Sequence, residues 1–281
     1  MKKQRTHKFV DKHPLLSGVL GTAILFLVFV LFYIVASIIN NIFGSNPIIV
    51  TVTTLISLCL TMLIYKWWFS PEYEGSLKGG NLKEGFLLCM PFGIYWLINI
   101  IVLIVSGDLK FNVTFAGFSA ALTAGIGEEI YYRIGSIPTM FKGWSDKKRH
   151  IVILLVSSAV FGLSHITNVF AGAELATTMH QVYTSFCHGL FFGALFMRCG
   201  NIIPAMFLHF SHDLLAIWLQ PEIVDETGVM IKTFSWDSGT ILDTVMATLL
   251  GICGILYVSF RYADKINEVW KKKWNKKEIA E

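Results

Sequence analysis

Charged side chains are scarce in this chain, and long stretches contain none. Only 15% of the 281 residues are Asp, Glu, Lys or Arg, against about a quarter in an ordinary soluble protein. None lies between Lys12 and Lys66, or between Glu84 and Asp108. Both stretches exceed the roughly 20 residues that cross a bilayer as a helix, which argues against a soluble globular fold. The net charge of +4 requires no nucleic-acid partner, because lysines and arginines lie in predicted loops and tails.

Recognisable cofactor and nucleophile motifs are also missing. The five cysteines are scattered and include no CxxC pair, a pattern typical of small buried apolar side chains rather than of disulfides or a zinc cluster. The chain has no HExxH zinc helix, no GxSxG elbow and no phosphate-binding loop. These absences argue against the familiar soluble zinc and serine hydrolases.

Eight apolar stretches make up most of the chain. We expect an all-α polytopic membrane protein with about eight transmembrane helices and a polar intramembrane cavity. The predicted spans cover residues 15–43, 48–69, 85–105, 111–138, 151–168, 174–198, 202–219 and 239–260. Pro91 is expected to kink the third span, and the fourth is expected to stop near Pro138.

The chain divides into three predicted regions. Residues 1–110 hold the first three spans, residues 111–220 form the core with spans four to seven, and residues 221–281 hold the last span and a basic tail. In the tail, four apolar residues recur at helical spacing: Ala263, Ile266, Trp270 and Trp274. This spacing predicts an amphipathic helix on the membrane surface.

Basic residues concentrate at the N-terminus, after the fourth span and in the tail. By the positive-inside rule we expect an integral membrane protein with both termini cytoplasmic, in a bacterial plasma membrane. Glu128 then lies about 15 Å and His209 about 12 Å from the cytoplasmic end of their spans, at 1.5 Å per residue. We therefore expect a cavity that opens toward the cytoplasm.

Glu128, Glu129 and Arg133 interrupt the fourth span. Ionisable groups inside a membrane are costly and commonly mark functional sites. Glu129 and Arg133 are four residues apart on one helical face, so we expect them to pair. Glu128 points about 100° away from Glu129 and has no partner in its own helix. It is the candidate general base that takes a proton from water.

Two later spans supply His165, His209 and Asp213. Asp213 follows His209 by four residues and can fix its tautomer or hold a water. Two chemistries remain open. Glu128, His165 and His209 can bind a divalent metal such as zinc that activates water. Alternatively, Glu128 activates water unaided while His209 donates to the oxyanion. For His180, His188 and His212 the pattern favours packing roles.

Three motifs in order resemble the CPBP family, which joins type II CAAX prenyl endopeptidases with bacteriocin-processing and immunity proteins. The family pattern EExxxR, FxxxH and HxxxN or HxxxD matches Glu128 to Arg133, Phe161 to His165 and His209 to Asp213. The resemblance covers residues 116–216. It implies proteolysis inside the membrane, with Glu128 activating water and His165 and His209 completing the site. Asp213 stands where relatives often have Asn.

The sequence therefore predicts an intramembrane endopeptidase that cleaves a membrane-proximal peptide or protein. Its role would be CAAX-type processing, peptide maturation or bacteriocin self-immunity. The partners we expect are the substrate and the lipid bilayer. Two alternatives are a non-catalytic peptide-binding immunity protein and a proton-coupled transporter with a buried Glu–His relay. The candidate catalytic residues are Glu128, Glu129, Arg133, His165, His209 and Asp213.

Overall fold

The computed structural model describes residues 2–43, 46–70, 72–144, 149–220, 224 and 232–274. All regular elements in these ranges are helical, which confirms the predicted all-α class. Five are long and apolar enough to cross a membrane. These are α2 (Pro14–Phe43), α3 (Pro47–Phe69), the α4–α5 pair (Leu82–Ser106), α8 with part of η3 (His150–Phe170) and α11 (Ser238–Tyr257). The shorter α10 (Ile203–Leu219) is also apolar. The polytopic membrane fold is confirmed, and the number eight stays a prediction.

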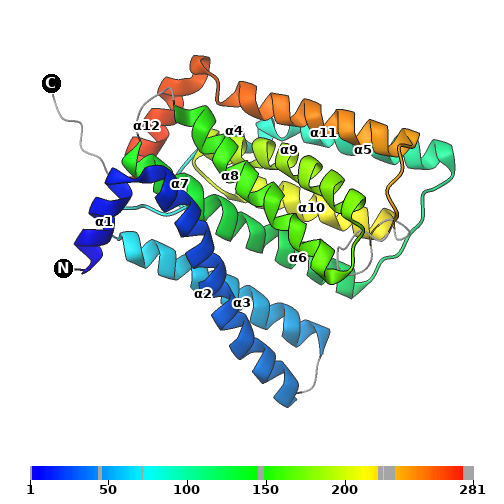
Figure 1. Ribbon diagram of the computed structural model, residues 1–281, viewed down its shortest axis with the longest axis horizontal. Helices are drawn as coiled ribbons and strands as arrows, with labels where there is room; N and C mark the ends of the chain where they lie inside the picture. The colour runs from blue at the N-terminus through cyan, green and yellow to red at the C-terminus, as the bar shows by residue number, and fades with distance from the viewer. Residues whose placement is uncertain are drawn as a thin grey trace.

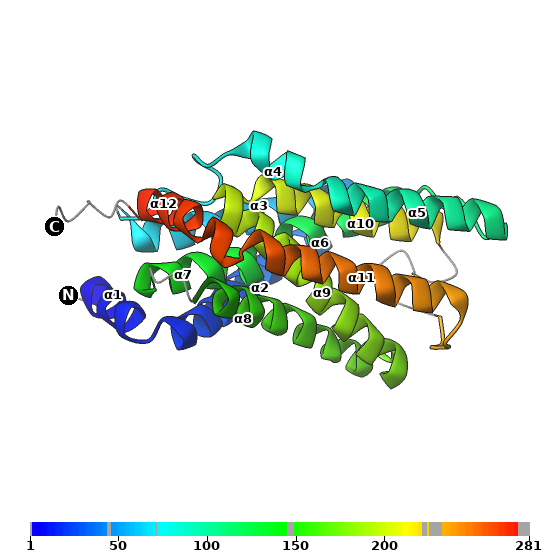
Figure 2. The ribbon, with the colours of Figure 1, turned by 90° about the horizontal axis from the view of Figure 1, so that it is seen from above.

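Helix α9 (Leu175–Cys199) forms the centre of the bundle. It packs against α8 (His150–Ser164), α10 and α11, and the side chains from Cys187 to Cys199 are all buried. Helix α6 (Phe115–Glu128) packs on α10. Helices α2 and α3 pack on each other and slant away from the remaining helices (Figure 1). The view from above shows α9 between α8 and α11 (Figure 2).

Proline breaks one predicted span and is accommodated within another. The third span divides at Cys89 into α4 (Leu82–Leu88) and α5 (Met90–Ser106), with Pro91 in the first turn of α5. Proline is tolerated there because a first-turn N–H has no helical acceptor, and the predicted kink is confirmed.

The expectation that the fourth span stops near Pro138 is wrong. Thr114 caps its start, and α6 leads into a π-helical segment, η1 (Glu129–Ile134), and then into α7 (Gly135–Gly143). Pro138 lies in the first turn of α7, directly after a segment where the i→i−4 ladder has already given way to the wider π pattern. A missing N–H is therefore tolerated, and the helix runs on to Gly143.

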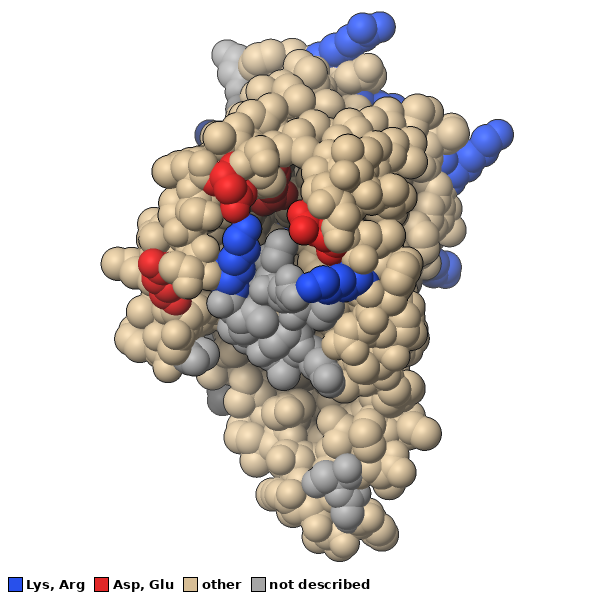
Figure 3. All heavy atoms as spheres, turned by 90° about the vertical axis from the view of Figure 1, so that its right-hand side faces the viewer, with Lys and Arg blue, Asp and Glu red and all other residues tan. Residues whose placement is uncertain are grey.

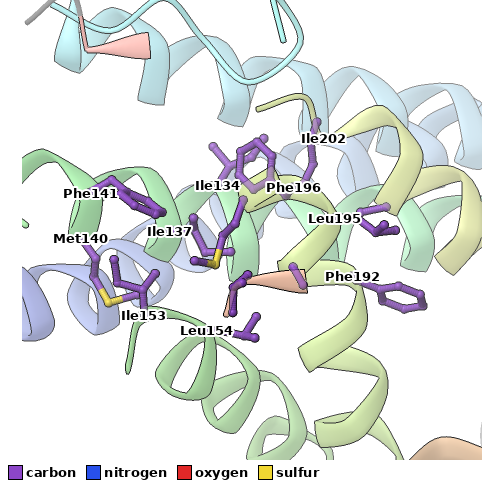
Figure 4. Close-up of a cluster of buried hydrophobic side chains, with 14 of the residues drawn as sticks. Ile134, Ile137, Met140, Phe141, Ile153, Leu154, Phe192, Leu195, Phe196 and Ile202 are labelled. Atoms are coloured by element: carbon purple, nitrogen blue, oxygen red, sulfur yellow. The ribbon is translucent and has the colours of Figure 1, made fainter. Parts of the chain in front are cut away.

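Buried side chains seal the end of the bundle that carries both chain termini. Helix α7 is buried from Gly135 to Lys142 and packs against α1 (Lys2–Lys12), α2 and α8. Figure 4 shows the apolar cluster that joins it to α8 and α9, with these residues labelled: Ile134, Ile137, Met140, Phe141, Ile153, Leu154, Phe192, Leu195, Phe196 and Ile202.

The amphipathic tail helix exists, but its apolar face covers protein rather than lipid. It is α12 (Ala263–Lys273), which follows the short η4 (Phe260–Tyr262). Trp270 stacks on Phe141 with ring centroids 4.5 Å apart, and its indole N–H donates to the Met197 carbonyl. Trp274 donates to the Pro138 carbonyl. The expected membrane-surface role of this face is therefore wrong, because α7 and α9 supply better-matched polar and apolar partners.

Candidate active site

Glu129 stands at the centre of a buried ionic cluster. Its Oε1 lies 3.2 Å from Nη1 of Arg133 and 2.9 Å from Nδ1 of His209. The side chains of Glu129 and Arg133 are fully buried. An isolated charge at such a position costs several kcal/mol, so each of the two needs the other to remain charged there. The predicted i, i+4 pair forms, and it extends across to α10.

Phe161 gives Arg133 a second contact that sequence reasoning missed. The guanidinium carbon lies 3.9 Å from the centroid of the Phe161 ring, a cation–π distance that is favourable where water is excluded. The same ring contacts His165 and His209 edge-on. The FxxxH motif was the available signal, because it requires Phe161 as well as His165. Phe161 therefore joins the ionic cluster to the histidines.

His209 is held in one orientation. Its Nδ1–H donates to Glu129, and Phe192 stacks on the ring with centroids 5.2 Å apart. Its Nε2 then faces Oε2 of Glu128 at 3.7 Å and Oδ2 of Asp213 at 3.6 Å. These distances are too long for good direct hydrogen bonds, and they suit a water or substrate atom shared among the three groups.

Glu128 differs from Glu129 in what its carboxylate can reach. Its side chain is 25% exposed, against 0% for Glu129, and it lines the internal cavity. Among the described residues, its Oε2 has no hydrogen-bond partner. Glu129 is therefore engaged in the ionic cluster, and Glu128 is the carboxylate available to a substrate.

His165 lies where α8 passes into η3 (His165–Ala171). Its Nδ1–H donates to the Phe161 carbonyl at 3.1 Å, which leaves Nε2 free to interact with a ligand. The side chain lines the same cavity as Glu128, His209 and Asp213. The structure therefore brings candidate residues from α6, α8 and α10 around one cavity of about 960 Å³.

A second polar group on the cavity wall went unrecognised in the sequence. The Tyr95 hydroxyl donates to Oδ1 of Asp243 at 2.9 Å. His188 and His212 lie next to Tyr95, with their own ring centroids 4.8 Å apart. His180, also on this wall, contacts Thr244. Asp243 was the signal that could have revealed the group, since it is a carboxylate in an apolar span.

The cavity opens at the end of the bundle opposite the chain termini. Its mouth is lined by Asp108 and Lys110 after α5, Gln220 after α10, and Lys232 and Asp237 before α11. Figure 3 looks onto this end, where acidic and basic side chains gather around a hollow. The expected opening on the side of the termini is wrong. The prediction rested on the depths of Glu128 and His209 along their helices. Those depths do not show that α7 and α12 seal the side of the termini.

The predicted metal ligands do not assemble into a recognisable ion site. Within the part of the chain that the structure describes, no group of three or more His, Cys, Asp or Glu residues could hold a metal ion. His209 and His165 already commit Nδ1 to Glu129 and to a backbone carbonyl. This leaves Nε2 of both rings for a ligand, so binding of a divalent metal by Glu128, His165 and His209 stays a prediction.

Residues 110–215 match the family model described as type II CAAX prenyl endopeptidase, Rce1-like. The matched region contains all three motifs and all six candidate catalytic residues. No curated protein and no solved structure gives a significant match to the chain. The family resemblance drawn from the motifs is confirmed by this match.

Proposed function

We propose that this protein cleaves peptide bonds inside the membrane with water activated by Glu128. Its residues 110–215 match the Rce1-like model of type II CAAX prenyl endopeptidases. One observation carries the proposal. A neutralised, fully buried Glu129–Arg133 pair holds His209 beside a partly exposed Glu128 in a cavity. Such a preorganised group of acid, base and hydrogen-bond donors is what hydrolysis of an amide requires.

In the proposed reaction, the Glu128 carboxylate takes a proton from a water that lies between it and His209. The resulting hydroxide attacks the peptide carbonyl carbon and forms a tetrahedral oxyanion. His209, when both ring nitrogens carry protons, donates Nε2–H to this oxyanion, and a protonated Asp213 can donate beside it. Glu128 then gives its proton to the departing amine as the C–N bond breaks, which returns the carboxylate to its starting form.

Glu129 and Arg133 act as positioning residues in this scheme. Glu129 accepts from Nδ1 of His209 and so directs Nε2 toward Glu128. Arg133 offsets the charge of Glu129, and its stacking on Phe161 fixes where that charge lies. Preorganisation of this kind lowers the barrier because no group has to reorient as the oxyanion forms.

The proposed substrate is a peptide or protein segment close to the membrane, and the proposed location is a bacterial plasma membrane with both termini cytoplasmic. The proposed role is CAAX-type processing, peptide maturation or bacteriocin self-immunity. Metal assistance is not part of the proposal, so we expect a chelator to leave the cleavage rate unchanged.

The experiment is cleavage of a peptide library by the purified full-length protein in water enriched in ¹⁸O. Hydrolysis predicts new termini and one ¹⁸O atom in each new carboxyl group. Glu268→Gln, an exposed carboxylate change on α12, is the matched control and should cleave like the wild type. Absence of cleavage across the library, with peptide still bound by the folded protein, would favour the non-catalytic binding function.

A further inference from the structure

The two ends of the bundle differ strongly in positive charge. Among the described residues, the connections at the mouth end are 46, 107–114, 172–174, 220, 224 and 232–237, and their basic residues are Lys110 and Lys232. The end with the termini is far richer. Its described basic side chains are Lys8, Lys12, Lys66, Lys78, Lys83, Lys142, Arg149, Arg198, Arg261, Lys265, Lys271, Lys272 and Lys273.

Lysine and arginine in short loops stay on the cytoplasmic side of a membrane. The end that carries α1, α7 and α12 is therefore the cytoplasmic end. The cavity mouth, lined by residues such as Asp108, Gln220 and Asp237, lies at the opposite end. This combination places the entrance to Glu128 on the extracytoplasmic side.

The cytoplasmic end offers no comparable approach to the site. Ile134, Ile137 and Met140 follow Glu128 along the chain toward that end. All three are 0% exposed and belong to the apolar cluster of Figure 4. Trp270 and Trp274 cover α7 from outside. A peptide coming from the cytoplasm would have to displace this packed core.

We infer that the substrate of this site is a positively charged peptide that enters from the extracytoplasmic face of the membrane. The inference rests on the proposed function and adds the side of entry and the class of peptide. It means that the substrate is a secreted, translocated or external peptide, or the extracytoplasmic part of a membrane protein.

The charge of the cavity wall supports the choice of a cationic peptide. Apart from the proposed oxyanion donors His209 and Asp213, the charged lining residues are four carboxylates and two lysines: Asp108, Glu128, Asp237, Asp243, Lys110 and Lys232. Lys232 pairs with Asp237 at 2.6 Å. A cavity wall with an excess of one sign of charge attracts ligands of the other sign and speeds their entry.

Asp243 is the carboxylate best placed to hold a basic group of such a peptide. Tyr95 donates to its Oδ1 and orients it. His188 lines the wall beside Tyr95, is 7% exposed, and has an Nε2 without a hydrogen-bond partner among the described residues. Asp243 thus provides an acceptor on the cavity wall, and the unpartnered Nε2 of His188 lies on the same wall.

The side of entry can be tested by cysteine labelling, which does not require the protein to cleave a peptide. In a Cys59→Ala background, Ser238→Cys marks the mouth and Glu268→Cys marks the end with the termini; both positions are exposed. We expect a membrane-impermeant maleimide to label Ser238→Cys on intact cells and Glu268→Cys only after permeabilisation. The reverse pattern would overturn the inference and leave the proposed function intact.

The peptide class is tested with two synthetic peptides of equal length. One carries lysine at the positions where the other carries alanine, and they are otherwise identical. The peptides are added outside sealed proteoliposomes, in which the orientation of the protein is known from the labelling. The lysine peptide should be cleaved only by protein molecules whose cavity mouth faces outward. Asp243→Asn should raise KM for the lysine peptide about tenfold more than it raises KM for the alanine peptide. Glu268→Gln is the control.

The two proposals fail in different ways. If the lysine peptide is cleaved only when it is enclosed on the other side, the inference fails and the function stands. If Asp243→Asn affects both peptides equally, the cationic class is wrong. If the wild type cleaves the peptide from neither side, both the inference and the proposed function are wrong.

Discussion

Glu129 and Arg133 carry opposite charges, and both side chains are fully buried. Glu129→Gln leaves the Arg133 guanidinium without its carboxylate, and breaking a buried pair in this way typically costs about 3–5 kcal/mol. We expect a large fall in the thermal midpoint of the protein in detergent. A midpoint within a degree of wild type would mean that Arg133 has another counter-charge.

The double variant Glu129→Gln with Arg133→Met separates folding from catalysis. Removing both charges should restore much of the stability, since the Gln–Met pair leaves no unpaired charge buried. Cleavage should stay low, because Nδ1 of His209 has lost its carboxylate acceptor. If the double variant cleaves peptide at the wild-type rate, the pair is purely structural.

Asp213 occupies the position where relatives often have Asn, 3.6 Å from Nε2 of His209. If it donates to the oxyanion as a protonated acid, Asp213→Asn keeps a donor and should retain kcat within a few-fold. Asp213→Leu has no donor, and we expect kcat to fall about 10²–10³-fold. Equal losses in the two variants would instead assign Asp213 the role of an ionised acceptor that orients His209.

At the scale of elements, the site depends on how closely α6 approaches α10. A Cβ added at Gly125 would lie 2.4 Å from the backbone nitrogen of Phe210, so Gly125→Ala must push the two helices apart. Glu128 belongs to α6 and His209 to α10, and their side chains are 3.7 Å apart. We expect lower stability and a reduced kcat, because misplacement by a fraction of an ångström weakens preorganised catalysis.

Gly93 on α5 provides the matched control for this variant. No heavy atom would lie within 4 Å of a Cβ added there, so Gly93→Ala should leave cleavage and thermal midpoint unchanged or slightly improved. Equal behaviour of the two alanine variants would contradict the close crossing.

Helix α12 is expected to contribute to folding rather than to membrane attachment. Trp270 is 2% exposed and packs on Phe141, so Trp270→Ala should cost about 3–5 kcal/mol. Lys271→Ala, on the exposed side of the same helix, is the control and should change stability little. Both variants should remain in the membrane fraction. Loss of membrane association by Trp270→Ala, with unchanged stability, would restore the surface-helix interpretation.

The ends and breaks of helices could be predicted from the sequence where the preference of a single residue determines them. Pro91 breaks its span because the missing N–H must sit in a first turn. Pro138 obeys the same rule, but its first turn is created by the π-helical segment upstream, which no single residue signals. The recurrence of Ile266 and Trp270 predicted a helix and an apolar face, yet could not say whether protein or lipid covers that face.

At the scale of the whole molecule, the catalytic candidates could be assembled from the sequence because spacing and order suffice. Four-residue intervals place Glu129 with Arg133 and His209 with Asp213, and the three motifs lie on separate helices. The direction in which the cavity opens could not be derived in this way. It depends on which end of the bundle is sealed, and that is settled by the packing of α7 and α12.

The central claim is that Glu128 does chemistry, and the most direct test measures binding and turnover of one peptide by Glu128→Gln. We expect kcat to fall at least about 10²-fold, the usual contribution of a general base, while peptide affinity and thermal midpoint stay close to wild type. Wild-type turnover by Glu128→Gln would contradict the account and assign the cavity to binding alone.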